Sequence, residues 1–372
     1  MTRRENLLTA MRGGMPEWIP ITGHVDPYNQ PSRENMDPEL AEALGTLRWG
    51  DDSTVLFSKY LDLDVMDWFS GAPVRSMRQN VSVETHREDV DTIRIWHTPR
   101  GDLREVSRQC REDGTTYRVE HLDKGPDDLP ALASISADEQ FEINPDRAEV
   151  YRHRKELIGD DGFIAFTVPS TPLGQMIRLW AGVQTTAYLW ADAPEALRET
   201  FQVMENNLIQ RIEAACQFDA EAIITVDDTS TTTVSPAMFQ KLCMDYTDRA
   251  ADLVHAHDKL YVHHSCGLIK NLLPLYRQTE MDCVHSFTVP PIGDVTVREG
   301  RELLGLDIAI FAGLVQLAQP IEDWDEVGAS IRQMFEGASP GAGFILGLTA
   351  YPDKTMDQTR RILEICRGFQ SL

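Results

Sequence analysis

Residues 260–267 combine residue types that bind metal ions. They read LYVHHSCG, an apolar segment typical of a buried strand that becomes polar at its end. Side chains two residues apart on a strand point to the same side, so His264 and Cys266 could present an imidazole and a thiolate together. Such a pair is half of a zinc site. The alternative is a buried histidine beside a small buried cysteine, because a single His-x-Cys motif is a weak signal.

Polar residues follow other predicted strands at corresponding positions. They are His24, Asp227, Asp228, His285 and Tyr351. In a parallel α/β barrel the reactive groups lie where strands lead into the following loops, so these side chains are expected at one face. Carboxylates packed near a strand end often take part in binding, although one of the two aspartates could instead cap the loop that follows them.

Alternation along the strands separates inward from outward side chains. Cys283 and His285 share one face, and we expect Cys283 in the core and His285 nearer the barrel mouth. His263 faces away from His264 and should pack against a helix. Trp180 and Trp190 lie on a helical pattern and are expected to pack in the same way.

Seven apolar segments have the length and composition of strands, and a helical pattern follows each one. The predicted strands cover residues 18–24, 163–168, 222–226, the segment from 260, and residues 282–287, 307–312 and 343–347. Helical patterns cover 2–12, 38–70, 145–159, 172–217, 236–257, 268–279, 295–304, 322–337 and 355–369. This order predicts an α/β fold, a (β/α)8 TIM barrel, with an open doubly wound sheet as the alternative. An eighth strand could lie at 53–57.

Residues 74–123 differ from the rest of the chain. Short segments alternate apolar and polar residues, and turn sequences such as Pro-Arg-Gly at 99–101 separate them. They predict an antiparallel β-hairpin insertion within one domain. No glycine-rich nucleotide-binding motif follows any predicted strand.

Composition restricts the partners. The 372 residues carry a net charge of −24 with a pI near 4.7, which argues against nucleic acid and anionic membrane surfaces. A local basic pocket for an acidic substrate remains compatible with this charge. No segment approaches 18 apolar residues, and the six cysteines form no C-x-x-C pair, so we expect a reducing, cytoplasmic location and no membrane. The sequence leaves a homodimer open.

Several segments stand in an order and spacing that together are more specific than any one of them. They are residues 3–13, 16–20, 98–103, 122–129, Asp227-Asp228 with Ser235-Pro236, and residues 264–267, 290–294 and 344–347. In this arrangement the chain resembles the uroporphyrinogen decarboxylase superfamily, and within it the corrinoid-linked methyltransferases. The resemblance implies one barrel domain over residues 1–372.

The resemblance also implies a metal site with one departure. In the methyltransferase branch a His-x-Cys motif and a late cysteine hold zinc, which assigns His264 and Cys266 as ligands. Ala350 stands where the late cysteine is expected, and Cys366 lies too far along the chain. A replacement ligand must come from a neighbouring strand end: His285, which we favour because imidazole suits zinc, or Asp227 or Asp228.

Three functions of different classes follow. The leading hypothesis is a zinc-dependent methyltransferase that exchanges a methyl group between a small methylated substrate or thiol and a corrinoid (cobalamin) on a partner protein, and that could act as a demethylase. In it Asp227 or Asp228 positions substrate, and His24 or Tyr351 handles a proton. The second is a metal-free decarboxylase, although residues 22–28 lack the arginine-rich signature of that branch. The third is a catalytically inactive binding barrel.

Overall fold

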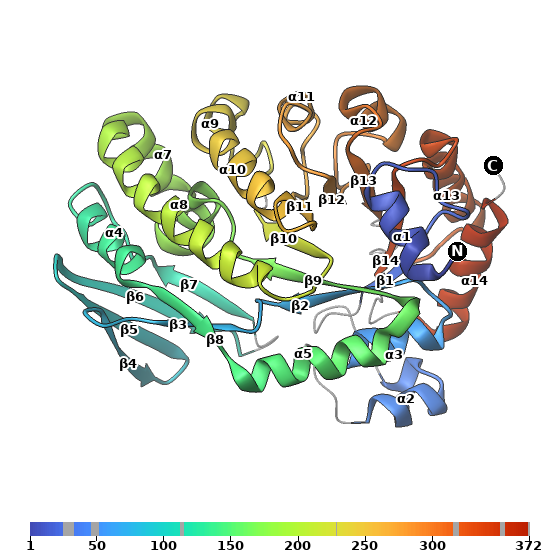
Figure 1. Ribbon diagram of the computed structural model, residues 1–372, viewed down its shortest axis with the longest axis horizontal. Helices are drawn as coiled ribbons and strands as arrows, with labels where there is room; N and C mark the ends of the chain where they lie inside the picture. Colours follow the sequence, from blue (N-terminus) through green and yellow to red (C-terminus); the bar gives the residue numbers. More distant parts are fainter. Residues whose placement is uncertain are drawn as a thin grey trace.

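Eight parallel strands form the centre of the molecule (Figure 1). The computed structural model describes residues 1–24, 33–45, 52–111, 115–227, 229–314, 320–349 and 354–370, and of His24 it describes the backbone only. The barrel strands are β1 (Ile21–His24), β2 (Val65–Ser70), β9 (Gly162–Val168), β10 (Ala222–Val226), β11 (Leu260–His264), β12 (Cys283–Phe287), β13 (Ala309–Gly313) and β14 (Phe344–Thr349).

The sheet closes on itself. Its order is β1-β14-β13-β12-β11-β10-β9-β2, so β1, the first strand of the chain, pairs in parallel with β14, the last. The Asp64 N–H donates to the Ile21 carbonyl at 3.0 Å, in a parallel bridge that joins β2 to β1. The predicted (β/α)8 barrel is therefore confirmed, because an open doubly wound sheet would not pair these edges.

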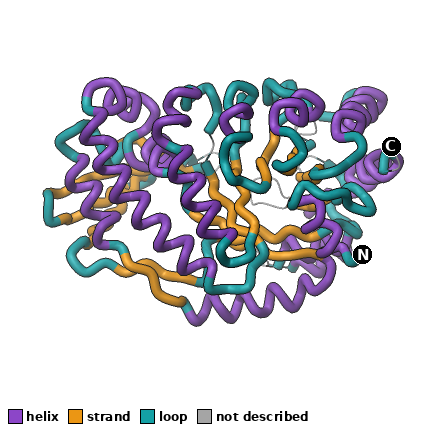
Figure 2. The backbone as a smooth tube through the Cα atoms, turned by 45° about the horizontal axis from the view of Figure 1, so that its top comes forward, coloured by secondary structure: helices purple, strands orange, loops and turns teal. Residues whose placement is uncertain are grey.

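Helices surround the strands on the outside (Figure 2). They are α2 (Pro38–Leu44), α3 (Ser53–Tyr60), α5 (Pro145–Ile158), α6 (Pro172–Gln175), α7 (Gly182–Asp192), α8 (Pro194–Cys216), α9 (Pro236–Leu242), α10 (Met244–His255), α11 (Leu273–Tyr276), α12 (Val297–Leu304), α13 (Trp324–Ala338) and α14 (Met356–Gly368). Short helices are η1 (Arg33–Asn35), η2 (Gly159–Asp161) and the π-helical turn η3 (Met176–Trp180). Within the described residues, no helix combines the length and the apolar character that crossing a membrane requires.

Two predicted helical stretches are interrupted. The stretch at 172–217 is divided by η3 into α6, α7 and α8. The stretch at 268–279 contains only the short helix α11, because the Asp294 carboxylate accepts hydrogen bonds from the N–H groups of Ile269 and Lys270 and holds that segment in a loop.

The insertion is antiparallel, as expected. Strands β4 (Ser82–Glu88), β5 (Asp91–Thr98), β6 (Gly101–Gln109) and β7 (Thr116–Glu120) form a four-stranded sheet at the end of the molecule away from both termini (Figure 1). It extends beyond the predicted end at residue 123, because β3 (Val74–Met77) pairs with β8 (Gln140–Ile143) after the intervening helix α4 (Leu129–Asp138).

The position of the eighth strand differs from the expectation. Residues 53–57 belong to helix α3, and the strand is β2, inside the stretch at 38–70 that we expected to be helical. A buried charge in its middle hides the strand pattern. Asp67 points away from the barrel interior and accepts hydrogen bonds from Arg154 of α5 at 3.0 and 3.1 Å, which stabilises the carboxylate against burial.

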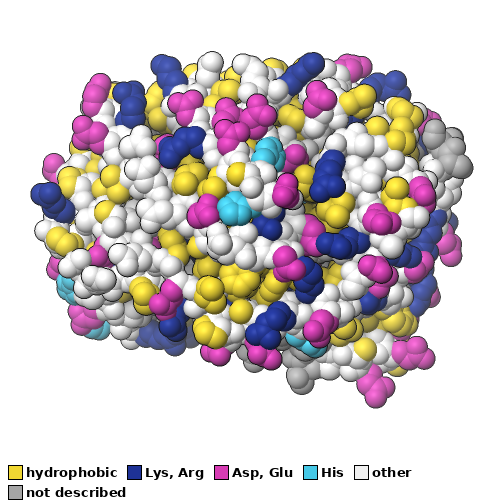
Figure 3. Space-filling view, in the orientation of Figure 1, with side chains coloured by type: hydrophobic (Ala, Val, Ile, Leu, Met, Phe, Trp, Pro, Cys, Tyr) yellow, Lys and Arg dark blue, Asp and Glu magenta, His cyan; other side chains and the backbone are white. Residues whose placement is uncertain are grey.

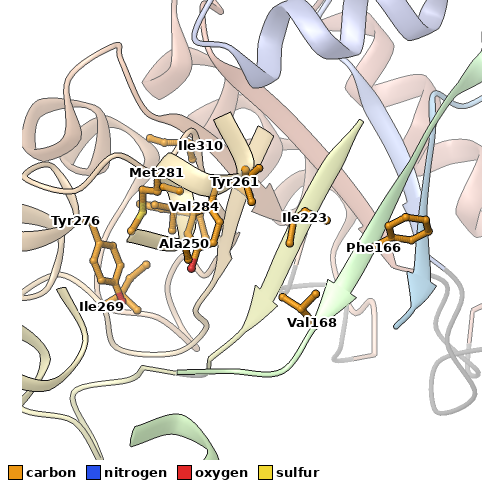
Figure 4. Packing of buried hydrophobic residues seen from close by; sticks show 14 of the residues in the cluster. Phe166, Val168, Ile223, Ala250, Tyr261, Ile269, Tyr276, Met281, Val284 and Ile310 are labelled. Carbon is orange, nitrogen blue, oxygen red and sulfur yellow. The ribbon is translucent and has the colours of Figure 1, made fainter. Parts of the chain in front are cut away.

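Two hydrophobic clusters hold the barrel. One fills its interior and includes Met66, Phe163, Ile224, Val262 and Ile345, with Leu7 and Met11 of α1 (Arg3–Met11) closing the amino-terminal end. The other lies between the strands and the outer helices. Figure 4 shows outward side chains of that second cluster on neighbouring strands, Phe166 and Val168 on β9 and Ile223 on β10. Because the inner cluster fills the rest of the interior, the polar part of the barrel lies at the carboxyl ends of the strands.

Candidate active site

The barrel interior becomes polar above the inner cluster. Leu260 and Val262 of β11 belong to that cluster, so strand alternation places His264 on the same inward face. On β12, Cys283 is fully buried in the cluster and His285 occupies the next inward position. Burial raises the pKa of Cys283, which keeps this thiol neutral as a packing group. The expected burial of Cys283 is confirmed.

The two inward histidines face each other. His264 and His285 are register partners on adjacent parallel strands. Their Nδ1 atoms are 2.9 Å apart, and their ring centroids are 5.0 Å apart. The Ser265 N–H also donates a hydrogen bond to the His285 carbonyl, which fixes the two strand ends together. The barrel thus presents two ring nitrogens within reach of one shared proton or one shared ion.

Aromatic rings enclose the histidine pair. Trp68 of β2 lies edge-on to both, with ring centroids 4.3 Å from His285 and 5.6 Å from His264. Phe311 of β13 lies opposite His285 in the register, at 4.4 Å between centroids. These rings limit rotation of the imidazoles and form an aromatic wall beside them. Neither Trp68 nor Phe311 was identified from the sequence as a site residue, although the inward positions Met66-x-Trp68 and Ala309-x-Phe311 carry the signal.

A buried polar network lies behind the strand that carries His264. His263 is fully buried and contacts Phe239 of α9 and Tyr276 of α11, as expected for a side chain facing the helices. The Thr229 hydroxyl lies 3.2 Å from His263 Nε2, 2.7 Å from the Tyr276 hydroxyl and 2.9 Å from the Ser265 hydroxyl. Burial raises the pKa of Tyr276, so its hydroxyl stays neutral. This network fixes the backbone between His264 and Cys266.

Asp227 lies in this outer layer. Its side chain is fully buried, and Oδ1 accepts hydrogen bonds from the Thr171 N–H at 3.0 Å and the Thr171 hydroxyl at 2.7 Å. Thr171 caps the start of α6, so Asp227 joins the end of β10 to the loop after β9. Its Oδ2 lies 3.7 Å from His263 Nδ1. The structure places Asp227 where it supports the loops around the site.

The remaining candidates are distributed as follows. Cys266 follows β11, is half-buried and forms no disulfide. Cys366 is buried in α14, where burial raises its pKa to about 12. His24 ends β1, and its side chain, like Asp228, Ala350 and Tyr351, lies outside the described residues.

The donors present agree with zinc in type and partly in spacing. Two ligands of a tetrahedral zinc ion at about 2.0–2.1 Å lie roughly 3.3 Å apart, a few tenths of an ångström more than the separation of the two Nδ1 atoms. Among the described residues, no group of three or more His, Cys, Asp or Glu side chains converges to hold a metal ion. The histidine pair fits zinc, and the described residues do not complete a three-ligand site.

Comparison with protein families identifies the class. A family model described as uroporphyrinogen decarboxylase (URO-D) matches residues 116–369, and the chain belongs to this family. No curated protein sequence matches the chain.

A solved methyltransferase structure shares the fold, and two other solved structures show only low similarity. The chain is similar to a methyltransferase from Methanosarcina mazei with a TM-score of 0.65 and 14% sequence identity, over 99% of each chain. A glycoside hydrolase family 5 enzyme from Prevotella bryantii has a TM-score of 0.37 and 8% identity, over 67% of this chain and 87% of that one. A D-psicose 3-epimerase from Clostridium cellulolyticum has a TM-score of 0.31 and 8% identity, over 60% of this chain and 84% of that one.

Proposed function

We propose that this protein is a zinc-dependent methyltransferase. It would move a methyl group between a small methylated substrate or thiol and a corrinoid carried by a partner protein, and in the reverse direction it would act as a demethylase. Membership of the URO-D family and the shared fold with a methyltransferase support the class. The substrate class and the corrinoid are inferred from the resemblance to corrinoid-linked methyltransferases, and the zinc from that resemblance together with the His-x-Cys motif.

The observation that carries the proposal is the facing pair His264 and His285 in the barrel interior, with Cys266 two residues beyond His264. The pair lies at the carboxyl ends of adjacent strands, where barrel enzymes hold their reactive groups. Zinc bound there would act as a Lewis acid that lowers the pKa of a thiol or alcohol. His264 and His285 would be two of its ligands, and Cys266 would have to move towards them to become the third, because these three side chains, all among the described residues, do not converge in the structure.

The residues around the histidine pair hold it in position. Trp68 and Phe311 fix the imidazole rings and make the environment drier, which strengthens electrostatic interactions there. The network of His263, Thr229 and Tyr276 positions the backbone of the ligand-bearing strand. Asp228 remains a candidate for positioning substrate, and His24 and Tyr351 for moving a proton.

The proposal can be tested with methylcobalamin as methyl donor and a series of small thiols as acceptors. Transfer to a thiolate breaks the cobalt–carbon bond, leaves the electron pair on cobalt as cob(I)alamin and forms a thioether. Under anaerobic conditions we expect the absorbance of methylcobalamin to fall only when zinc is present. One thioether should form for each methylcobalamin consumed. His264→Ala and Cys266→Ala should abolish it. His257→Ala, a change at a histidine that pairs with Glu213 on the outer helices, should not.

The decarboxylase alternative gives a different result. A protein that retains full activity without zinc, and that releases carbon dioxide from an acidic substrate without consuming methylcobalamin, would contradict the methyltransferase proposal.

A further inference from the structure

A second cavity lies between the insertion and the barrel. Its volume is about 340 Å³, within the range of sites for small molecules. Strands β5–β7 of the insertion, helices α4 and α8, and the loop after β9 contribute its walls. None of the side chains around the histidine pair is among its lining residues in the described part of the chain.

This cavity is basic in an acidic protein. Four arginines and two glutamates line it, so the lining carries a net charge of +2 while the whole chain carries −24. The charged lining residues are Arg78, Arg94, Arg118, Arg211, Glu105 and Glu139. Positive charge concentrated at low dielectric attracts anions.

Three of these arginines form ion pairs with the two glutamates. Arg78 pairs with Glu139 at 2.6 Å. Glu105, which is itself buried, pairs with both Arg94 and Arg118. These pairs lie within the insertion, and Arg118 joins it to the barrel by donating to the Leu179 carbonyl of η3 at 2.8 Å.

Arg211 differs from the other three. Its guanidinium stacks over Phe141 at 5.6 Å from the ring centroid. Within the described chain it has no carboxylate at ion-pair distance and makes no hydrogen bond. Burial lowers the pKa of Arg211, because a desolvated guanidinium loses hydration. A cation in this position is pre-organised to receive an anionic group in bidentate geometry.

Two further buried donors belong to residues that line the same cavity. Arg78 Nε and the indole Nε1 of Trp96 have no acceptor in the described part of the protein. Buried donors are normally hydrogen-bonded, so these two N–H groups are available to an oxygen of solvent or of a ligand. Trp180 packs against the core and also contributes to the lining, with apolar side chains of α4 and α8.

We propose that this cavity binds a small organic dianion, a flat apolar molecule with two carboxylate groups or one phosphate group. Arg211 binds one anionic oxygen pair, and Arg78 and Trp96 donate to the remaining oxygens. The aromatic and aliphatic walls contact the body of the ligand. The site is separate from the histidine pair and does not depend on the proposed methyl transfer.

Isothermal titration calorimetry tests this with three probes: benzene-1,3-dicarboxylate, phenyl phosphate and, as the neutral control, benzamide. We expect one dianion per chain, weaker binding at higher salt, and no binding of benzamide. The stronger of the two dianions identifies the anionic group. Arg211→Gln should weaken binding at least tenfold, because it removes a charge-assisted contact. Trp96→Phe, which removes only the N–H, should weaken it several-fold.

Matched variants separate the loss of this site from a general loss of charge or of folding. Arg87→Gln removes one positive charge from an exposed position of the same insertion and should leave the affinity unchanged. His264→Ala should also leave it unchanged, since it alters only the barrel interior. Thermal unfolding would verify that each variant is folded. If Arg211→Gln does not fold, Trp96→Phe provides the test of binding in its place. The proposal is overturned if neither dianion binds the wild-type protein, if benzamide binds equally well, or if His264→Ala abolishes binding.

Discussion

His264 and His285 are register partners on adjacent strands, and each is the next inward-facing residue after a buried one. They therefore face each other. Val262 and Cys283 fill the barrel below them, and Trp68 and Phe311 pack beside them. The imidazoles therefore have little rotational freedom. A pair of imidazoles held in this way loses little conformational entropy when it binds an ion, which favours binding.

Trp68→Ala tests this pre-organisation. Removal of the indole leaves both imidazoles free to rotate and admits water, so zinc affinity should fall by about tenfold to a hundredfold, the range found for groups that support metal ligands. Competition with a chromophoric chelator would measure it. Trp68→Phe retains an aromatic wall and should recover most of the affinity; equal affinity in all three proteins would show that the ring does not position the ligands.

Asp227→Ala distinguishes structural support from metal binding. It leaves the N–H and hydroxyl of Thr171 without their acceptor in a buried place, so we expect the free energy of unfolding to fall by about 2–4 kcal/mol. Zinc content should remain that of the wild-type protein. Loss of zinc at unchanged stability, measured by urea unfolding and metal analysis, would make Asp227 a ligand instead.

Asp123 should make stability depend on pH. Burial, and then the charge of Asp128, raises the pKa of Asp123 from its ordinary 3.8 to about 7. The folded state therefore binds the proton more tightly than the unfolded state, and stability falls as pH rises from about 4 to about 7. The shift corresponds to at most about 4 kcal/mol.

The measurement is the midpoint of thermal unfolding between pH 4.5 and 7.5. Asp123→Asn keeps the acceptor oxygen for the Gly125 N–H and should flatten the dependence over this range. The exposed neighbour provides the control, since Asp127→Asn should reproduce the wild-type curve. Parallel curves for wild type and Asp123→Asn would show that Asp123 does not titrate as inferred.

At the scale of elements, the strands that follow the insertion could be predicted because they are short, apolar and regularly spaced. β9–β14 lie within about three residues of their expected positions, and strand parity placed His264 and His285 on one face. Strand β2 could not be predicted in this way, because Asp67 interrupts its apolar pattern and only the distant Arg154 accounts for that charge. Trp68 was missed for the same reason.

The contact between β2 and β9 depends on one glycine. A Cβ at Gly162 would lie 1.7 Å from the Val65 carbonyl oxygen of the paired strand. Gly162→Ala should therefore separate the strands and lower the unfolding midpoint by several degrees or prevent folding. Gly328→Ala in α13 meets no atom within 4 Å and should be neutral or stabilising by up to about 1 kcal/mol. Equal midpoints for the two variants would contradict this role of Gly162 in the closure.

At the scale of the whole molecule, the face shown in Figure 3 carries no broad basic patch. Acidic and basic side chains alternate over the surface shown in Figure 3, and the net charge is −24. The expectation that a basic pocket could exist within this acidic chain is met by the cavity beneath the insertion. The barrel thus carries two chemically different regions: an interior with histidines and aromatic rings, and a basic cavity between barrel and insertion.

The most direct test of the central claim is the zinc content of the protein purified without chelator, measured by inductively coupled plasma mass spectrometry. We expect about one zinc per chain in the wild type and in His257→Ala, and far less in His264→Ala, Cys266→Ala and His285→Ala. Zinc that is absent from the wild type, even after incubation with the ion and desalting, or zinc that persists when both His264 and Cys266 are replaced, would contradict the claim.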